Sequence, residues 1–223
     1  MSEQHPTRRR EALSASGIVR AAIEILDAAG EDALTFRLLA ERLSTGAGAI
    51  YHHVRNKDEL LQAAAAELVA GIAAMKEPLV PSDASVRKLM LEVFDLIDGH
   101  PWLGSQLARA PWQPAVLLVF EAVGERLETA GVPERHRFDV ASAFVNYVLG
   151  AAGQCAAGAR IPLAVTRPGF LKSVTEAWTS RAGREELPFV HAMAGQLADH
   201  DDRRQFAVGV DVLLAGAAAI PRT

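Results

Sequence analysis

The chain has 223 residues, of which 50% are hydrophobic, so it can bury a large core as one long domain or as a small domain followed by a larger one. Its formal net charge is −4, and residues 1–60 balance eight Lys/Arg against nine Asp/Glu, which argues against a non-specific polyanion binder. The single cysteine, Cys155, excludes an internal disulfide and an all-cysteine metal site, and the lack of a long apolar run or a signal peptide predicts a soluble, cytoplasmic protein.

The first helix is predicted from about Ser16 to Ala29. Its apolar positions keep helical spacing, and Gly30 is a natural end; the positions are Ile18, Ala22, Ile25, Leu26 and Ala29. A basic run, Arg8 to Arg10, precedes this helix and suits a flexible arm that lies on phosphates or in a minor groove. A solvated tail explains the same run equally well.

Residues 35–61 have the pattern of two short helices joined by a tight turn. The first helix has one apolar face, made by Phe36, Leu39, Ala40 and Leu43, with Thr35 placed to cap its first turn. Residues 44–46 then break the period. In the second helix Ile50 and Val54 point one way, whereas Gly48, Ala49 and His52 point the other. This outer face of small and polar residues predicts a helix-turn-helix that enters a DNA groove.

A third helix is expected to start at Lys57, because Asn56 followed by Glu59 is a capping-box pattern. It continues through Leu61, Ala64, Leu68, Ile72 and Met75 to the prolines at 78 and 81. Residues 77–83 are the one linker-like segment. We therefore predict a DNA-binding domain at 1–76 and a larger C-terminal domain at 77–223.

This stretch resembles the DNA-binding half of the tetracycline-repressor family of bacterial transcriptional regulators, over about a fifth of the chain. The residues that carry the resemblance agree in register: Thr35, Leu39-Ala40, Ile50-Tyr51, His53, Asn56-Lys57 and Asp58. Two positions depart from the family pattern. Ser44 stands where the family usually has the turn glycine, and Gly46 stands where Ser or Thr usually caps the recognition helix.

The resemblance implies that the Tyr51 hydroxyl donates a hydrogen bond to a phosphate oxygen while the ring packs on the protein. Lys57, Thr35 and Arg37 are expected at the DNA backbone, and His52 and His53 at a base edge or phosphate. Ala47, Gly48 and Ala49 have no hydrogen-bonding side chain, so they would contact thymine methyl groups or let the helix approach the groove closely. Recognition of the DNA sequence should therefore depend partly on DNA shape. A structural tyrosine and an ordinary surface lysine would explain Tyr51 and Lys57 without DNA. The complete set of candidate DNA-binding residues is Thr35, Arg37, Gly46, Ala47, Gly48, Ala49, Tyr51, His52, His53 and Lys57.

Beyond the linker only helical patterns occur, so the predicted fold is all-α: a three-helix DNA-binding domain and a C-terminal helical bundle. Helices are expected at about 86–98, 102–108, 114–130, 133–158, 168–181 and 201–220. The fourth and last of these are dense in Ala and Gly. The resemblance implies that they pair with their mates in a four-helix homodimer interface, and tight packing within one chain would explain the same composition.

Most aromatic residues lie beyond residue 90, and several share helices with isolated polar groups such as Asn146, Gln154, Gln106 and His100. An apolar cavity with a few polar groups is typical of a small-molecule site. The candidate ligand-binding residues are Phe94, Trp102, Trp112, Phe144, Tyr147 and Trp178.

The resulting hypothesis is a ligand-responsive repressor: a homodimer binds double-stranded operator DNA, and a small organic effector releases it. No cofactor and no catalytic residue are expected. A helical enzyme is the first rival, but no metalloprotease, hydrolase, phosphate-loop or cysteine-pair motif accompanies the histidines. Two further hypotheses are a metal ion bound by His100 and a regulator that acts through protein contacts without a small ligand.

Overall fold

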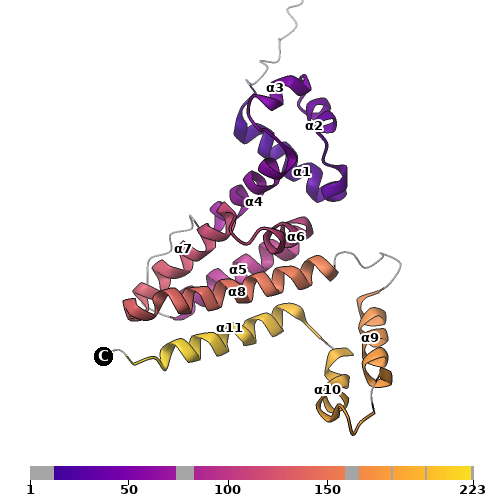
Figure 1. Ribbon diagram of the computed structural model, residues 1–223, viewed down its shortest axis with the longest axis vertical. Helices are drawn as coiled ribbons and strands as arrows, with labels where there is room; N and C mark the ends of the chain where they lie inside the picture. Colours follow the sequence, from indigo (N-terminus) through magenta and orange to yellow (C-terminus); the bar gives the residue numbers. More distant parts are fainter. Residues whose placement is uncertain (1–12, 74–82, 159–165, 182, 199, 222–223) are drawn as a thin grey trace, which may run out of the picture. The chain divides into compact units, whose positions relative to one another are not determined.

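A computed structural model describes residues 13–73, 83–158, 166–181, 183–198 and 200–221, and these contain helices and no strand, which confirms the all-α prediction. The chain divides into two compact units, Met1–Leu68 and Val69–Thr223 (Figure 1). The basic run at Arg8 to Arg10 lies outside the described residues. So do the predicted domain boundary at 76–77 and nearly all of the linker.

The first unit contains α1 (Ala15–Ala33), α2 (Phe36–Arg42), α3 (Ala47–Tyr51) and the start of α4 (Lys57–Ala73). Its core is formed by apolar residues from all four helices, including Ile18, Ala22, Ile25, Leu26, Leu39, Ile50, Leu60 and Leu61. Gly30 has a φ of 75° and interrupts α1, as predicted, although a further turn follows it. Ala29, expected on the apolar face, is exposed because it lies just before this interruption.

The turn between α2 and α3 is a Schellman motif. The backbone N–H of Thr45 donates to the Ala40 carbonyl (3.0 Å), and that of Ser44 donates to the Glu41 carbonyl (3.1 Å). The motif requires a left-handed residue, and Ser44 takes that role with a φ of 52°. The family usually has glycine at this position because glycine adopts a left-handed conformation without strain. Ser44 adopts the same conformation, so the turn is kept, but its Cβ makes the backbone strained.

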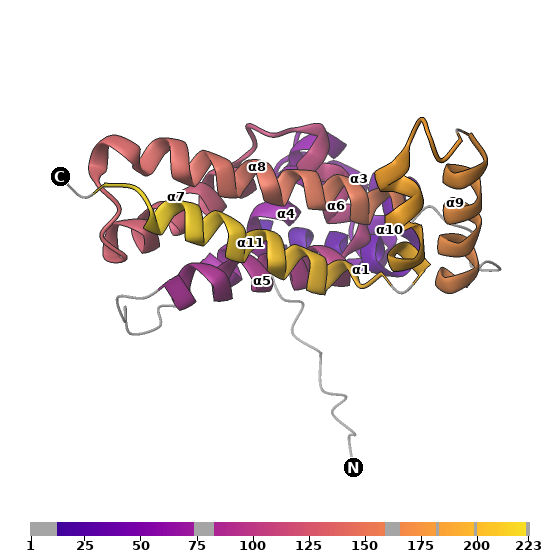
Figure 2. The same cartoon turned by 90° about the horizontal axis from the view of Figure 1, so that it is seen from below.

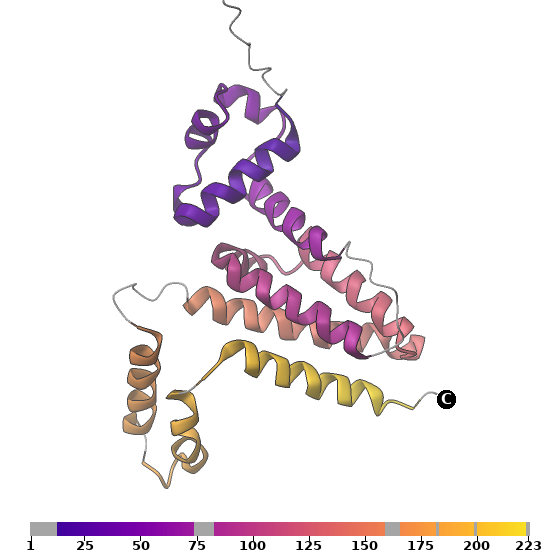
Figure 3. The ribbon, with the colours of Figure 1, turned by 180° about the vertical axis from the view of Figure 1, so that it is seen from behind.

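The second unit is a helical bundle built from α5 (Asp83–Gly99), α6 (Pro101–Arg109), α7 (Pro114–Thr129), α8 (Glu134–Gly158) and α11 (Asp202–Ala218), with α9 (Arg167–Arg181) and α10 (Pro188–Ala198) packed against each other. The helix α10 was not predicted. The apolar stripe expected on α5 is buried along its whole length, from Val86 to Ile97. Helices α5, α8 and α11 run along one another (Figure 3).

Close helix packing in this unit depends on a glycine and on ion pairs. A Cβ added at Gly104 of α6 would lie 2.6 Å from the Ala152 carbonyl oxygen of α8, so no larger residue fits there without a shift.

Helices α5 and α11 are joined by two reciprocal ion pairs. Arg87 Nε lies 2.7 Å from Asp211 Oδ1, and Arg203 Nε lies 2.6 Å from Asp95 Oδ1.

Among the described helices, α8 alone is long and apolar enough to cross a membrane by length and composition. One side of α8 packs against α6 and α7, however, and buries Ala141, Phe144, Val145, Val148 and Ala152 in the bundle. Helix α8 is therefore a packed element of the bundle in this structure. Its other side faces outward beside α11 (Figure 2).

Candidate nucleic-acid interface and ligand cavity

Helix α3 turns its small and polar residues outward, as the sequence predicts. Ile50 and the following Val54 are buried and anchor it, whereas Gly48, His52 and the adjacent His53 are exposed. Ala47 and Ala49 are half-buried. Gly46 precedes α3 and, having no side chain, gives it no cap hydrogen bond. The helix is therefore held by two aliphatic anchors and by the turn before it.

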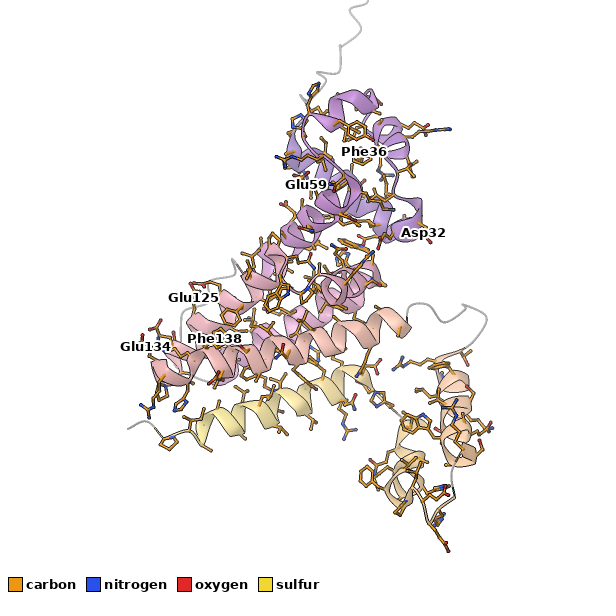
Figure 4. The ribbon with its side chains drawn as sticks, viewed as in Figure 1. Asp32, Phe36, Glu59, Glu125, Glu134 and Phe138 are labelled. Atoms are coloured by element: carbon orange, nitrogen blue, oxygen red, sulfur yellow. The ribbon has the colours of Figure 1, made fainter. Side chains whose placement is uncertain are left out.

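Tyr51 is oriented by an aromatic stack. Its ring lies 4.5 Å from that of Phe36 in α2, with an interplanar angle of 9°, and Phe36 is seen within the first unit in Figure 4. The tyrosine is still 54% exposed. The ring thus packs on the protein while about half of the residue stays open to solvent, and this arrangement is compatible with a phosphate contact.

The caps expected at the helix starts are present. Thr35 Oγ1 accepts the backbone N–H of Leu38 (3.1 Å), and Asn56 Oδ1 accepts that of Glu59 (2.8 Å). The Glu59 carboxylate reaches back to the backbone N–H of Arg55 (2.8 Å), one residue earlier than a standard capping box. These bonds fix the starts of α2 and α4 on either side of α3.

Two candidate phosphate-contacting cations of this unit, Lys57 and Arg37, also make bonds within the protein. Lys57 Nζ donates to the Glu31 carbonyl oxygen (2.6 Å) and is half-buried, so it ties the end of α1 to the start of α4. The sequence did not predict this bond. An ammonium group has three N–H donors, so one such bond leaves donors for a phosphate. Arg37 is 89% exposed at its side chain and pairs with Glu41 at 3.1 Å.

The second unit contains a cavity of about 920 Å³ lined mainly by α5, α8, α9 and α11, with one residue each from α6 and α10. Three of the predicted ligand residues line it, namely Phe94, Tyr147 and Trp178, together with the predicted polar groups Asn146 and Gln154. Phe170 and Phe206 also line the cavity, although they were not among the candidates. Both residues could be read from the sequence as aromatic, but no sequence pattern placed them in the same cavity as Tyr147.

The other three candidates lie elsewhere. Trp102 and Phe144 are buried in the bundle core, and Trp112, in the turn before α7, is 88% exposed. Gln106 is a buried residue of α6 outside the cavity lining, and His100 packs edge-on against Trp102 with 6.4 Å between ring centroids. Within the described part of the chain, no three His, Cys, Asp or Glu side chains gather to hold a metal ion.

One wall of the cavity is a cluster of three rings. Phe206 of α11 stacks on Tyr147 of α8 at 4.9 Å and 13°, and lies 4.9 Å from Phe94 of α5. The Tyr147 hydroxyl donates to the Phe206 carbonyl (3.3 Å) directly over Gly209, where an added Cβ would lie 2.0 Å from that hydroxyl. Burial raises the pKa of Tyr147, so it remains a neutral donor near pH 7.

The cavity lining also contains charged residues. Arg167 at the start of α9 pairs with Asp202 at the start of α11, and His200 Nε2 lies 2.8 Å from the same carboxylate. All three residues line the cavity, as does Cys155. Burial, then the nearby Asp98 and Asp202, raise the pKa of the Cys155 thiol and favour its uncharged form.

A Thr-capped helix, a Schellman turn and a short second helix with an exposed face of small and polar residues define the helix-turn-helix class of DNA-binding proteins. The family model described as "Bacterial regulatory proteins, tetR family" matches residues 18–64. The chain belongs to the tetracycline-repressor (TetR) family of transcriptional regulators.

Similarity to known regulators extends over nearly the whole chain. The solved structure of the transcriptional regulator SCO7222, a TetR from Streptomyces coelicolor, is 43% identical, with 93% of this chain and 98% of that one covered and a TM-score of 0.78. An HTH-type transcriptional regulator of Saccharopolyspora erythraea is 28% identical, with 96% and 88% covered. The S. coelicolor protein ActR in complex with actinorhodin is 25% identical, with 94% and 98% covered and a TM-score of 0.76.

Proposed function

We propose that this protein is a homodimeric repressor that binds operator DNA through α3 and leaves it when a small organic molecule occupies the cavity of the second unit. The observation that carries the proposal is the outward face of α3, where Gly48 and His52 are exposed while Ile50 is buried. Such a face has no role in the protein's own core. The setting is the bacterial cytoplasm, where a soluble regulator meets DNA.

In this proposal some residues position the protein on the DNA backbone, and others recognise the base sequence. Tyr51, Thr35, Arg37 and Lys57 contact phosphates, which sets the register of the protein on the duplex. His52 and His53 donate to base edges or phosphates. The residues of the segment Gly46–Ala49 lack hydrogen-bonding side chains and bring the helix close to the groove, so sequence is read partly through DNA shape.

The effector part of the proposal rests on the cavity and on a relative. Phe94, Tyr147 and Trp178, with Phe170 and Phe206, provide aromatic surface, and Asn146 and Gln154 provide hydrogen-bonding groups. ActR, whose fold is similar, has been solved with actinorhodin bound. Release of DNA requires only that the effector bind the DNA-free state better than the DNA-bound state.

The homodimer is supported by the outer sides of α8 and α11. Val208 and Val212 of α11 are 56% and 66% exposed, and Phe138 of α8 is 70% exposed. Gly150 and Gly216 have open space where a Cβ would be, so packing within the chain does not explain their small size. Two copies would place two recognition helices on half-sites separated by about one or more turns of DNA.

The test is a gel-shift titration of the purified protein with DNA that flanks its gene, at two salt concentrations, with scrambled DNA as the control. The expected result is a sequence-selective complex that weakens as salt rises. Absence of any selective, salt-sensitive shift would reject the DNA-binding role. A thermal-shift screen against small organic molecules separates this proposal from a regulator that acts through protein contacts alone, because an occupied cavity stabilises the fold.

A further inference from the structure

Two carboxylates of the cavity lie on the same side of its ring cluster. Helices α5 and α11 run antiparallel, as the two ion pairs between them require. Asp98 follows Phe94 by one turn of α5, and Asp202 precedes Phe206 by one turn of α11. Since the Phe94 and Phe206 rings are in contact, at 4.9 Å between centroids, both carboxylates lie beyond the same side of that contact. Both also line the cavity.

The charges of the described cavity lining do not balance. The two carboxylates, of Asp98 and Asp202, face one guanidinium, that of Arg167. Arg167 pairs with Asp202, and His200 Nε2 lies 2.8 Å from the same carboxylate. None of the described residues forms an ion pair or a side-chain hydrogen bond with Asp98. The described lining therefore carries one uncompensated negative charge, at Asp98.

The Cys155 thiol, which also lines the cavity, indicates the sign of the local potential. Burial raises its pKa most, and the charges of Asp98 and then Asp202 raise it further, whereas Arg167 lowers it by less than either carboxylate raises it. The two carboxylates thus outweigh the guanidinium at the thiol, and the potential there is negative. A negative potential in a cavity attracts cations and repels anions.

The aromatic wall of the cavity favours the same charge. The face of an aromatic ring is electron-rich and attracts a cation that lies within about 6 Å of the ring centroid. Tyr147, Phe206 and Phe94 form the ring cluster, and Phe170 and Trp178 add two further rings to the lining. A ligand with an anionic group would bring that group against electron-rich faces and an unpaired carboxylate.

We propose that the effector is a largely apolar molecule that carries a protonated amine, with its apolar part against the ring cluster and its ammonium group at Asp98. This inference rests on the proposed function, because it names the chemical class of the effector which that function requires. Asn146 and Gln154, which also line the cavity, provide hydrogen bonds to uncharged polar substituents.

Three fluorescent probes that differ only at one end test the proposal without a known effector. They are the N-(5-aminopentyl), N-hexyl and N-(5-carboxypentyl) amides of dansyl, which share a fluorophore and an alkyl chain and end in an ammonium, a methyl or a carboxylate group. Dansyl emission increases in apolar surroundings, so fluorescence titration of the full-length protein gives the affinity of each probe. The variant is Asp98→Asn. The matched control is Asp139→Asn, an exposed aspartate of α8 outside the described cavity lining.

The wild type is expected to bind the ammonium probe about fivefold more tightly than the methyl probe, since exposed ion pairs typically contribute up to about that factor. The carboxylate probe should bind most weakly. Asp98→Asn should remove the preference for the ammonium probe without changing the affinity of the methyl probe, and Asp139→Asn should behave as wild type. Added salt should reduce the same preference in the wild type.

Equal affinities of the wild type for the three probes would overturn the proposal, as would tighter binding of the carboxylate probe or no binding of the ammonium probe. A preference that persists in Asp98→Asn would also overturn it, because the ammonium group would then bind elsewhere. If circular dichroism shows that Asp98→Asn does not fold, the salt titration of the wild type decides: a preference that salt does not reduce would overturn the proposal.

These titrations contain no DNA, so they are independent of operator binding. A protein that fails the gel shift but prefers the ammonium probe through Asp98 would lose the proposed function and keep the cation site. A protein that binds its operator but shows no preference among the probes would keep the proposed function and lose the inferred class of effector.

Discussion

The two units of the chain form their functional surfaces by different routes. In the first unit, the residues that orient α3 lie close to it in sequence: Thr35 caps α2, Ser44 makes the turn and Asn56 caps α4. In the second unit, the cavity wall joins residues that are distant in sequence, such as Tyr147 and Phe206, which are 59 positions apart. The exposed face of α3 is therefore determined by residues close to it in sequence, whereas the cavity depends on how whole helices pack.

If the second unit depends on helix packing, it should be sensitive to a substitution at the close contact between α6 and α8. We expect Gly104→Ala to lower the free energy of unfolding by about 2 kcal/mol, since overpacking a close contact typically costs ~1–3 kcal/mol. The new Cβ would lie 2.6 Å from a backbone oxygen and 3.3 Å from Ile97 Cγ2, and a backbone atom cannot move aside cheaply. Urea denaturation measures the effect.

The control is Gly124→Ala in α7, where nothing lies within 4 Å of the added Cβ. It should leave stability unchanged or raise it by about 0.5–1 kcal/mol through helix propensity. Equal effects of the two substitutions would mean that the α6–α8 contact is not close in solution.

Lys57 makes a bond in the first unit that does not follow from residues close in sequence, because its partner Glu31 lies 26 positions away. We expect Lys57→Met to lower the free energy of unfolding by about 1.5 kcal/mol, the low end for hydrogen bonds to charged groups. If the same ammonium group also contacts a phosphate, the salt dependence of operator binding should fall by about one unit of slope. Denaturation and salt-dependent binding titrations separate the two roles.

Lys172→Met on α9, an exposed lysine outside the first unit, is the control and should change neither quantity. A stability loss with an unchanged salt slope would show that Lys57 acts only as a structural tie between α1 and α4.

Substitutions in the stacked pair Phe36 and Tyr51 test whether the Phe36 ring positions the Tyr51 hydroxyl. Tyr51→Phe and Phe36→Leu are each expected to weaken operator binding about tenfold, which corresponds to ~1.4 kcal/mol. Because Phe36 acts through Tyr51, the double variant should bind no worse than Tyr51→Phe alone. Fluorescence anisotropy with labelled operator measures all four affinities. Additive losses would instead assign Phe36 a separate role in holding α2 against α3.

This difference between the units also explains what the sequence could predict. Helical spacing and caps identified the outward face of α3, and the stripe from Val86 to Ile97 on α5, because both follow from residues within one helix. Apolar residues that face a cavity have the same helical spacing as apolar residues that face the core. For that reason Phe144 could not be separated from Tyr147, which lies three residues further along α8.

Two other features were missed because they depend on contacts between distant parts of the chain. Phe206 lines the cavity only because α11 packs beside α5 and α8, a contact that no local pattern encodes. The bond from Lys57 ends on a backbone carbonyl, which has no sequence signature. Helix α10 did carry a local signal, since Pro188 occupies its first turn, and it could have been found by the same rules as α6 and α7.

A substitution at Ser44 tests whether the turn of the first unit is determined by local backbone conformation, and its expected effect on the free energy of unfolding is the smallest of those considered. Ser44 has a φ of 52°, a left-handed conformation that strains any residue with a Cβ and that glycine adopts freely. We expect Ser44→Gly to raise the free energy of unfolding by about 0.5–1 kcal/mol, because relief of strain exceeds the entropy that glycine gains in the unfolded chain. Operator affinity should not change, since the Schellman bonds are made by the backbone. Ser105→Gly, inside α6, is the matched control and should destabilise by about 0.5–1 kcal/mol. If Ser44→Gly also destabilised the protein, the turn would owe its geometry to the serine side chain and not to the backbone.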